Sequence, residues 1–410
     1  MYRRSFITAL GALALAATEV QALRAATLPT ANIELGDDVF LRSEWEGLAG
    51  RCVGIITNQT GVTSRLVNIV DAVKANRKIC LKAIYSPEHG LRGDRPAGAY
   101  VSSYVDDRTG LPVYSLYGPQ KHPTPQMLDG VEVLLFDIQD VGARPYTFVS
   151  TMAYAMQAAA SYGKEIWILD RPNPIGGEMV EGPVLDPQFK SFIGLYPIAM
   201  RHGMTVGELA RMFNDHFGIG AGLHVVKMEG WQRSMFWPDT GLQWVQTSPN
   251  IPEWSTTVVY PCTGLVDSFG LNGGVGTTRP FKYTGAAGMD AYRFASILNA
   301  RNVPGVYFRP AYWSPFFGFL ANKQIAGVEL DVFDPRAFPS VETAVHILTA
   351  AREVDPHQLV YGTRGEDIDW GTDTLWKGLK AGYGPEQILE EWQPAVARFK
   401  DLRANYLLYD

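Results

Sequence analysis

Glu88 is the acidic residue that most clearly suggests catalysis. It lies in the sequence SPEHG at residues 86–90, directly after an apolar stretch, so a glycine-bounded loop can present its carboxyl group to a cleft. A carboxyl group that acts as a general acid near neutral pH needs its pKa raised by burial or by a nearby negative charge. Asp137 or Asp140, which end another apolar stretch, could supply that charge. The pattern predicts a general acid at Glu88.

Glu88 and His89 could also have purely structural roles. Glu88 could form a salt bridge with Arg92 or Arg144, and His89 is as well accounted for by a hydrogen-bonded spacer as by a catalytic base. The sequence contains no His-Glu-x-x-His zinc signature and no Gly-x-Ser-x-Gly nucleophile elbow. A metal-dependent site remains an alternative, with the candidate ligands His89, Asp94, Asp137 and Asp140.

A second carboxyl group is needed if the chemistry is glycoside hydrolysis, because such enzymes flank the scissile bond with two carboxyl groups. Glu178 and Glu181 lie in a glycine-rich turn at residues 176–183, and Glu181 is favoured by the Gly-Pro that follows it. The predicted catalytic residues are therefore Glu88, Glu181, Asp137, Asp140 and His89.

Polar side chains elsewhere could bind the substrate. An arginine guanidinium matches a carboxylate in shape, and the backbone amides at residues 201–204 precede a helix start that could receive an anionic group. Arg171 could simply pair with Asp170, whereas Asn173 is held between two prolines. The candidate binding residues are Asn58, Arg144, Tyr146, Arg171, Asn173, Arg201, His202, Asn250 and Arg279.

Five short apolar runs alternate with amphipathic stretches, the pattern of βα units around a parallel sheet. Residues 64–76 and 148–160 have helical length and spacing. Polar clusters follow four of the runs, and the carboxyl ends of parallel strands meet at one edge of a sheet. We therefore predict an α/β fold with a Rossmann-like parallel sheet, whose strands lie at residues 52–57, 79–85, 113–117, 131–138 and 166–169.

The length of 410 residues favours two domains, because a single hydrophobic core stops growing at roughly 250–300 residues. Residues 178–283 are rich in Gly, Pro and Trp and suggest loops over the site, with one helix at 205–217 that Thr205 and Glu208 open as a capping box. The apolar periodicity of helices and strands resumes past about residue 280. We predict a catalytic domain at 32–280 and a smaller α/β domain at 281–410.

Composition excludes several classes of function. A net charge of -6 offers no basic surface for nucleic acid, and no stretch of about 18 apolar residues predicts a membrane span. Three cysteines make neither a disulfide framework nor a zinc site, so free thiols are expected. The glycine-rich sequence at residues 273–280 lacks the Lys-Ser or Lys-Thr of a phosphate-binding loop.

The first residues predict export. Arg3 and Arg4 precede an apolar run at residues 9–17, and small residues follow at 25–26. These features are typical of a signal peptide, and the paired arginines suggest the twin-arginine route. We predict that residues 1–26 are removed and that the protein is periplasmic or secreted.

Six motifs in order give a more specific resemblance. They are ITNQTG (56–61), SPEHG (86–90), DIQDVGARPY (137–146), LDRPNP (169–174), SPNIP (248–252) and GTTRPF (276–281). Together they resemble the exo-β-N-acetylmuramidase family, formerly a domain of unknown function, from about residue 32 to the end of the chain. The sequence departs from that family at residues 266–274 and at Lys282, where an acidic residue is common.

The resemblance implies a Rossmann-like domain joined to a smaller one, and release of terminal N-acetylmuramic acid from peptidoglycan fragments without a cofactor. It places Glu88 on the family's strongest catalytic candidate. The lactyl carboxylate of this sugar gives Arg144, Arg201 or Arg279 a possible partner. Two alternatives remain, a periplasmic muropeptide-binding protein without catalysis and a metal-dependent cell-wall hydrolase.

Overall fold

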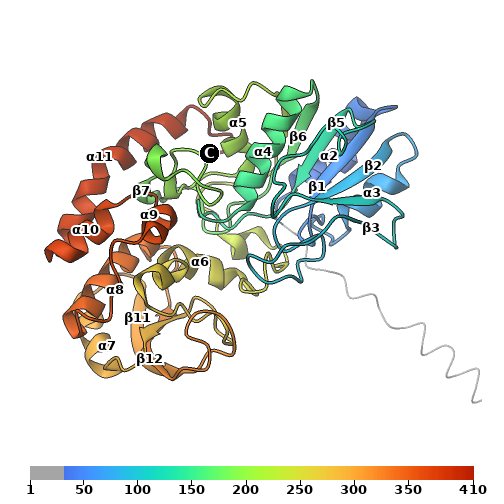
Figure 1. Cartoon of the computed structure of the whole chain (residues 1–410). Helices are drawn as coiled ribbons and strands as arrows, with labels where there is room; N and C mark the ends of the chain where they lie inside the picture. Colours follow the sequence, from blue (N-terminus) through green and yellow to red (C-terminus); the bar gives the residue numbers. More distant parts are fainter. Residues whose placement is uncertain (1–31) are drawn as a thin grey trace, which may run out of the picture.

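A seven-stranded sheet forms the centre of the first part of the chain in the computed structural model, which describes residues 32–410 (Figure 1). The predicted signal peptide at 1–26 lies outside the described residues. The order β3-β4-β2-β1-β5-β6-β9 is that of a Rossmann fold, with a short antiparallel strand β3 added at one edge. The strands are β1 (Cys52–Thr57), β2 (Cys80–Ser86), β3 (Tyr104–Val105), β4 (Pro112–Ser115), β5 (Val133–Asp137), β6 (Glu165–Leu169) and β9 (Gly222–Val226).

The central strands are apolar throughout because both faces of the sheet are covered. In β5, Val133 and Leu135 face one hydrophobic cluster, whereas Leu134 and Phe136 face another. The first cluster includes residues of α2 (Gly36–Arg42) and α3 (Ile69–Ala75). The second includes α4 (Phe148–Ser161) and α5 (Val206–Asp215). Helices on both faces confirm the predicted fold class.

Local signals fix where the helices begin. The Asn68 side chain accepts a hydrogen bond from Val70 N, so α3 starts only at Ile69, within the expected helical stretch at 64–76. The predicted capping box of α5 is present: Thr205 accepts from Glu208 N, and the Glu208 carboxylate accepts from Thr205 N.

The second part of the chain contains a three-stranded antiparallel sheet in the order β10-β12-β11. In Figure 1 this three-stranded sheet lies below the first sheet, and α7 packs against its strands and against α8. The elements are α6 (Trp254–Thr263), β10 (Tyr283–Ala286), α7 (Ala291–Ala300), β11 (Val306–Trp313), β12 (Ile325–Val332), α8 (Ser340–Val354), α9 (Arg364–Trp370), α10 (Thr374–Ala381) and α11 (Pro385–Ala404). The boundary at residue 280 stays a prediction, and α6, which precedes it, packs against α8.

Short elements join the two parts. The strands β7 (Glu181–Val184) and β8 (Ala199–Arg201) form an antiparallel pair, and β7 packs against α8 and α11. The 3-10 turns of the described chain are η2 (Glu44–Leu48), η3 (Pro187–Phe189), η4 (Trp237–Thr240) and η5 (Val266–Phe269). Among residues 32–410, no helix has both the length and the apolar character needed to cross a bilayer.

Candidate active site

The loops after β1, β2, β5 and β6 meet at one edge of the sheet. Thr57 and Asp137 are register partners where β1 pairs with β5, and β2 lies on the other side of β1. The chain order therefore reverses between β1 and β5, and this topological switch point is where open α/β sheets bind ligands. A small hollow of about 20 Å³ lies beside it, lined in part by Thr60, Gln139 and Arg171.

Glu88 is buried just after β2, with 7% of its surface exposed. Its Oε1 accepts a hydrogen bond from Gly98 N at 2.9 Å, and its Oε2 accepts one from Thr147 Oγ1 at 2.7 Å. Within residues 32–410 Glu88 forms no ion pair, and Arg92, one suggested partner, pairs with Asp106 at 2.5 Å instead. The carboxyl group is therefore oriented by two neutral donors.

The turn at His89 explains how Glu88 is presented. His89 has φ of 70° and Gly90 has φ of 77°, so two consecutive residues take the left-handed region and reverse the chain sharply. The His89 ring is fixed by a hydrogen bond between Nδ1 and Arg95 O at 2.8 Å. His89 therefore holds the loop, in the manner of the hydrogen-bonded spacer considered from the sequence.

The charge of Glu88 acts on three tyrosines, Tyr117, Tyr146 and Tyr260. Burial raises the pKa of Tyr117 to about 12, and the negative charge of Glu88 contributes to this shift. Burial also raises the pKa values of Tyr146 and Tyr260, with smaller contributions from Glu88 and Asp140. The rings of Tyr146 and Tyr260 meet edge to face at 5.8 Å. The sequence reasoning identified Tyr146 but missed Tyr117 and Tyr260, which come from distant segments.

Asp140 and His202 form a second polar pair near these tyrosines. Asp140 Oδ2 accepts from Gly142 N at 2.7 Å, and its Oδ1 is buried without a partner among residues 32–410. His202 Nδ1 accepts from Met204 N at 3.2 Å, so its proton is on Nε2, which points toward Asp140 Oδ2 at 3.7 Å. Buried polar atoms without partners are rare unless a ligand or water completes them. Asp140 and His202 are thus poised to contact a polar ligand.

Asp137 and Arg171 pair with each other. Arg171 Nε donates to Asp137 Oδ1 at 2.6 Å, and its Nη2 donates to Asp37 Oδ2 at 2.8 Å. Both carboxylates are fully buried. Arg171 therefore pairs with Asp37 and Asp137, not with Asp170 as the sequence suggested. Asp170 accepts hydrogen bonds from the start of α5, including Gly207 N at 2.8 Å.

Glu181 makes two strong contacts. Its Oε1 accepts from Arg201 Nη1 at 2.8 Å, and its Oε2 accepts from Val341 N at 2.8 Å at the start of α8. Both oxygens are therefore occupied in joining β7 and β8 to the second part of the chain. Among residues 32–410, no hydrogen bond or ion pair joins Glu181 to Glu88. Asp140, in contrast, contributes together with Glu88 to the raised pKa values of Tyr146 and Tyr260.

The remaining predicted binding residues are scattered. Asn58 Nδ2 is buried near the switch point without a partner in the described chain, and Asn173 donates to Met204 O at 3.1 Å. Arg144 donates to Trp370 O at 2.8 Å, and burial lowers its pKa to about 9. Asn250 is half-buried in the loop after η4, and Arg279 pairs with Glu329 at the three-stranded sheet.

The metal alternative finds no support in this geometry. Asp137 is committed to Arg171, and the His89 ring contacts the Arg95 carbonyl. In the part of the chain that the structure describes, no three His, Cys, Asp or Glu side chains are grouped as metal ligands. The three cysteines are free thiols, although Cys52 and Cys80 are register partners in β1 and β2.

Burial of Asp369 lowers the stability of the folded protein in a pH-dependent way. Burial raises the pKa of Asp369 to about 6. The pKa of Asp267, in η5, is also raised to about 6, mainly by burial and in part by the charge of Asp369. A raised pKa means that the folded state binds more protons than the unfolded chain between about pH 4 and pH 6, so stability falls as pH rises through this range. We expect Asp369→Asn to raise the unfolding free energy by about 1–3 kcal/mol at neutral pH and to change it little below pH 4. Urea titrations at several pH values would check this, and an equal effect at all pH values would contradict it.

Comparison with known proteins gives consistent matches. The family model described as exo-β-N-acetylmuramidase NamZ, N-terminal, matches residues 53–255, and the C-terminal model of the same family matches residues 258–409. The chain is 42% identical over 379 residues to the peptidoglycan β-N-acetylmuramidase NamZ of Bacillus subtilis, covering 92% of each chain.

Two crystal structures of DUF1343 family proteins from Bacteroides fragilis are also similar. The first has a TM-score of 0.87 and 36% identity over 93% of this chain and 100% of the other. The second has a TM-score of 0.73 and 28% identity over 92% of this chain and 99% of the other. Both parts of the fold are therefore shared with these proteins.

Proposed function

The chain belongs to the exo-β-N-acetylmuramidase NamZ family, and we propose that its site at Glu88 hydrolyses the glycosidic bond that releases terminal N-acetylmuramic acid from peptidoglycan fragments. The protein is a glycoside hydrolase of cell-wall turnover or recycling. One observation carries the assignment of the site: Glu88 is buried at the sheet edge, and hydrogen bonds from Gly98 N and Thr147 Oγ1 orient its carboxyl group.

Glu88 is the group that donates a proton to the glycosidic oxygen as the bond breaks. Its two hydrogen bonds hold the carboxyl group in one orientation at the sheet edge, and it forms no ion pair with a cation in the described residues. The departing sugar then leaves as a neutral alcohol, which lowers the barrier to cleavage.

Asp140 supplies the second carboxyl group in this proposal. Its Oδ1 is buried and has no partner within residues 32–410, unlike the oxygens of Glu181. A carboxylate in this state can stabilise the positive charge that develops on the sugar ring or accept a proton from water. His202 Nε2 lies beside it and can donate to Asp140 or to a substrate oxygen.

A product assay tests the proposal. We expect the protein to release N-acetylmuramic acid from a disaccharide whose non-reducing sugar is N-acetylmuramic acid, and not from one whose non-reducing sugar is N-acetylglucosamine. Mass spectrometry of the products, with and without a chelator, would show this. Binding without turnover would instead favour a muropeptide-binding protein, and loss of activity with the chelator would favour a metal-dependent enzyme.

Export would bring the enzyme to this substrate, since peptidoglycan lies outside the inner membrane. The paired Arg3 and Arg4 and the apolar run that follows support export through the twin-arginine route. Detection of the protein in the periplasmic or culture fraction would support this localisation, and retention in the cytoplasm would contradict it.

A further inference from the structure

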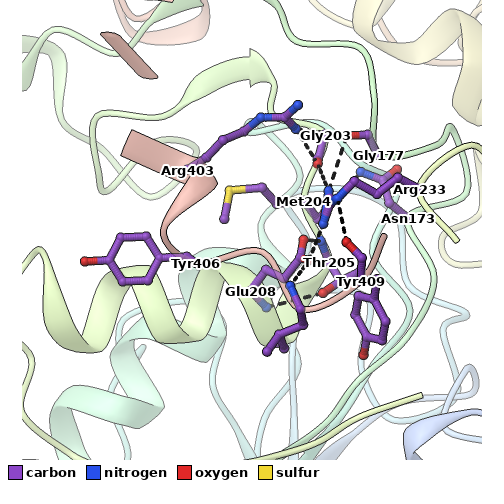
Figure 2. Close-up of polar contacts among 12 residues, drawn as sticks. Asn173, Gly177, Gly203, Met204, Thr205, Glu208, Arg233, Arg403, Tyr406 and Tyr409 are labelled. Atoms are coloured by element: carbon purple, nitrogen blue, oxygen red, sulfur yellow. Dashed lines mark hydrogen bonds and ion pairs between the residues drawn. The ribbon is translucent and has the colours of Figure 1, made fainter. Parts of the chain in front are cut away.

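The last residues of the structure lie against the loops that contain Gly177 and Gly203 (Figure 2). Arg403 lies at the end of α11, in the second part of the chain. Its Nη1 donates to Gly203 O at 2.6 Å and to Gly177 O at 2.9 Å, and it also contacts His202 O at 3.3 Å. A single guanidinium nitrogen thus joins two loops that are distant from α11 in sequence.

A second arginine reinforces the same point. Arg233 Nη1 donates to Gly203 O at 3.0 Å and to Gly177 O at 3.3 Å, while its Nη2 pairs with Glu208 of α5. The last residue of the chain also contacts Arg233, because Arg233 N donates to Asp410 O at 2.8 Å. Figure 2 shows both guanidinium groups converging on Gly203.

Gly203 is required by this arrangement. Its φ is 60°, and a Cβ added there would lie 2.5 Å from Arg403 Nη1 and 2.7 Å from Met179 O. The backbone between His202 and Met204 is therefore pressed against the guanidinium. His202 lies directly before this contact, and its ring is in turn fixed by Met204 N.

Burying two arginines side by side is unfavourable, because both positive charges lose their contact with water. Glu208 is the carboxylate that balances their charge at this point of the described chain. Burial lowers the pKa of Arg403 to about 10, and the neighbouring Arg233 contributes to this shift. Apolar side chains could join α11 to the loops without this cost. The use of a guanidinium suggests a need for fixed backbone geometry, which directional hydrogen bonds provide.

We propose that Arg403 is a positioning residue that fixes the loop at residues 202–204 and so keeps His202 Nε2 directed at Asp140. The second part of the chain thereby contributes to catalysis at the edge of the first sheet without touching the substrate. This inference rests on the proposed function, because it assigns His202 and Asp140 to that reaction.

A double-mutant cycle tests this inference. We expect Arg403→Met to lower kcat on the muramyl disaccharide about tenfold while KM changes less than about twofold, because the loss affects the chemical step. In a His202→Asn background the same Arg403→Met change should lower kcat less than about twofold, since its route through His202 is already removed. Arg403→Lys, which keeps a donor for the carbonyls, should recover part of the loss.

Arg352 offers a matched control. It lies in α8 and also donates to two backbone carbonyls, Leu379 O at 2.6 Å and Tyr383 O at 2.7 Å. Arg352→Met should lower the melting temperature but leave kcat unchanged. Normal kcat in Arg403→Met, or an equal loss in both His202 backgrounds, overturns the inference, and Arg403→Lys gives the same comparison if Arg403→Met does not fold. An inactive wild-type protein would instead overturn the proposed function.

Discussion

Replacing Glu88 with glutamine is expected to lower kcat about a thousandfold and to leave the fold intact. The loss follows because an amide cannot deliver a proton to the glycosidic oxygen, and general acid catalysis contributes about 10²- to 10⁴-fold. The fold should persist because a glutamine oxygen can accept from Gly98 N while its amide donates to Thr147 Oγ1. Release of N-acetylmuramic acid, measured beside the thermal unfolding curve, would show both results.

Glu181→Gln is the control for this experiment. Both Glu181 oxygens accept hydrogen bonds, from Arg201 and from Val341 N, so the amide group must face a donor. Breaking a buried charge pair costs about 3–5 kcal/mol, and we expect a clear loss of stability with kcat of the folded protein changed less than about threefold. If Glu88→Gln kept full activity while Glu181→Gln lost it, the two roles would have to be exchanged.

Replacing Asp140 with asparagine has the second largest expected effect, a decrease in kcat of about a hundredfold or more. Asparagine can still accept the hydrogen bond from Gly142 N, so the loop should keep its shape. The neutral amide can neither stabilise positive charge on the sugar nor accept a proton from water, as the second carboxyl group of a glycosidase must. Steady-state kinetics on the same disaccharide would measure the decrease.

Asp186→Asn provides the comparison for Asp140. The Asp186 side chain accepts from the backbone N–H two residues later, as Asp140 does, but it lies in an exposed turn before η3. Its substitution should leave kcat unchanged. Activity close to wild type in Asp140→Asn would remove Asp140 from the mechanism and leave Glu88 without its proposed partner.

The sequence was sufficient for the central strands because burial on both faces produces continuous apolar runs, as in β1 and β5. It was not sufficient for β9, where burial alternates at the sheet edge, or for β11, where Pro310 interrupts an edge strand. The helix α6 was also missed, because Pro261 and several β-branched residues weaken its pattern.

The sequence by itself determined that Glu88, Asp140, Tyr146 and His202 are candidates, because strand ends and loop glycines are local signals. Only the tertiary structure decided that Asp140, and not Glu181, shares the surroundings of Glu88, and that Asp137 pairs with Arg171. The reason is physical. A carboxylate's role depends on the donors and charges within a few ångströms, and here those come from residues far away in the chain, such as Thr147 for Glu88 and Val341 for Glu181.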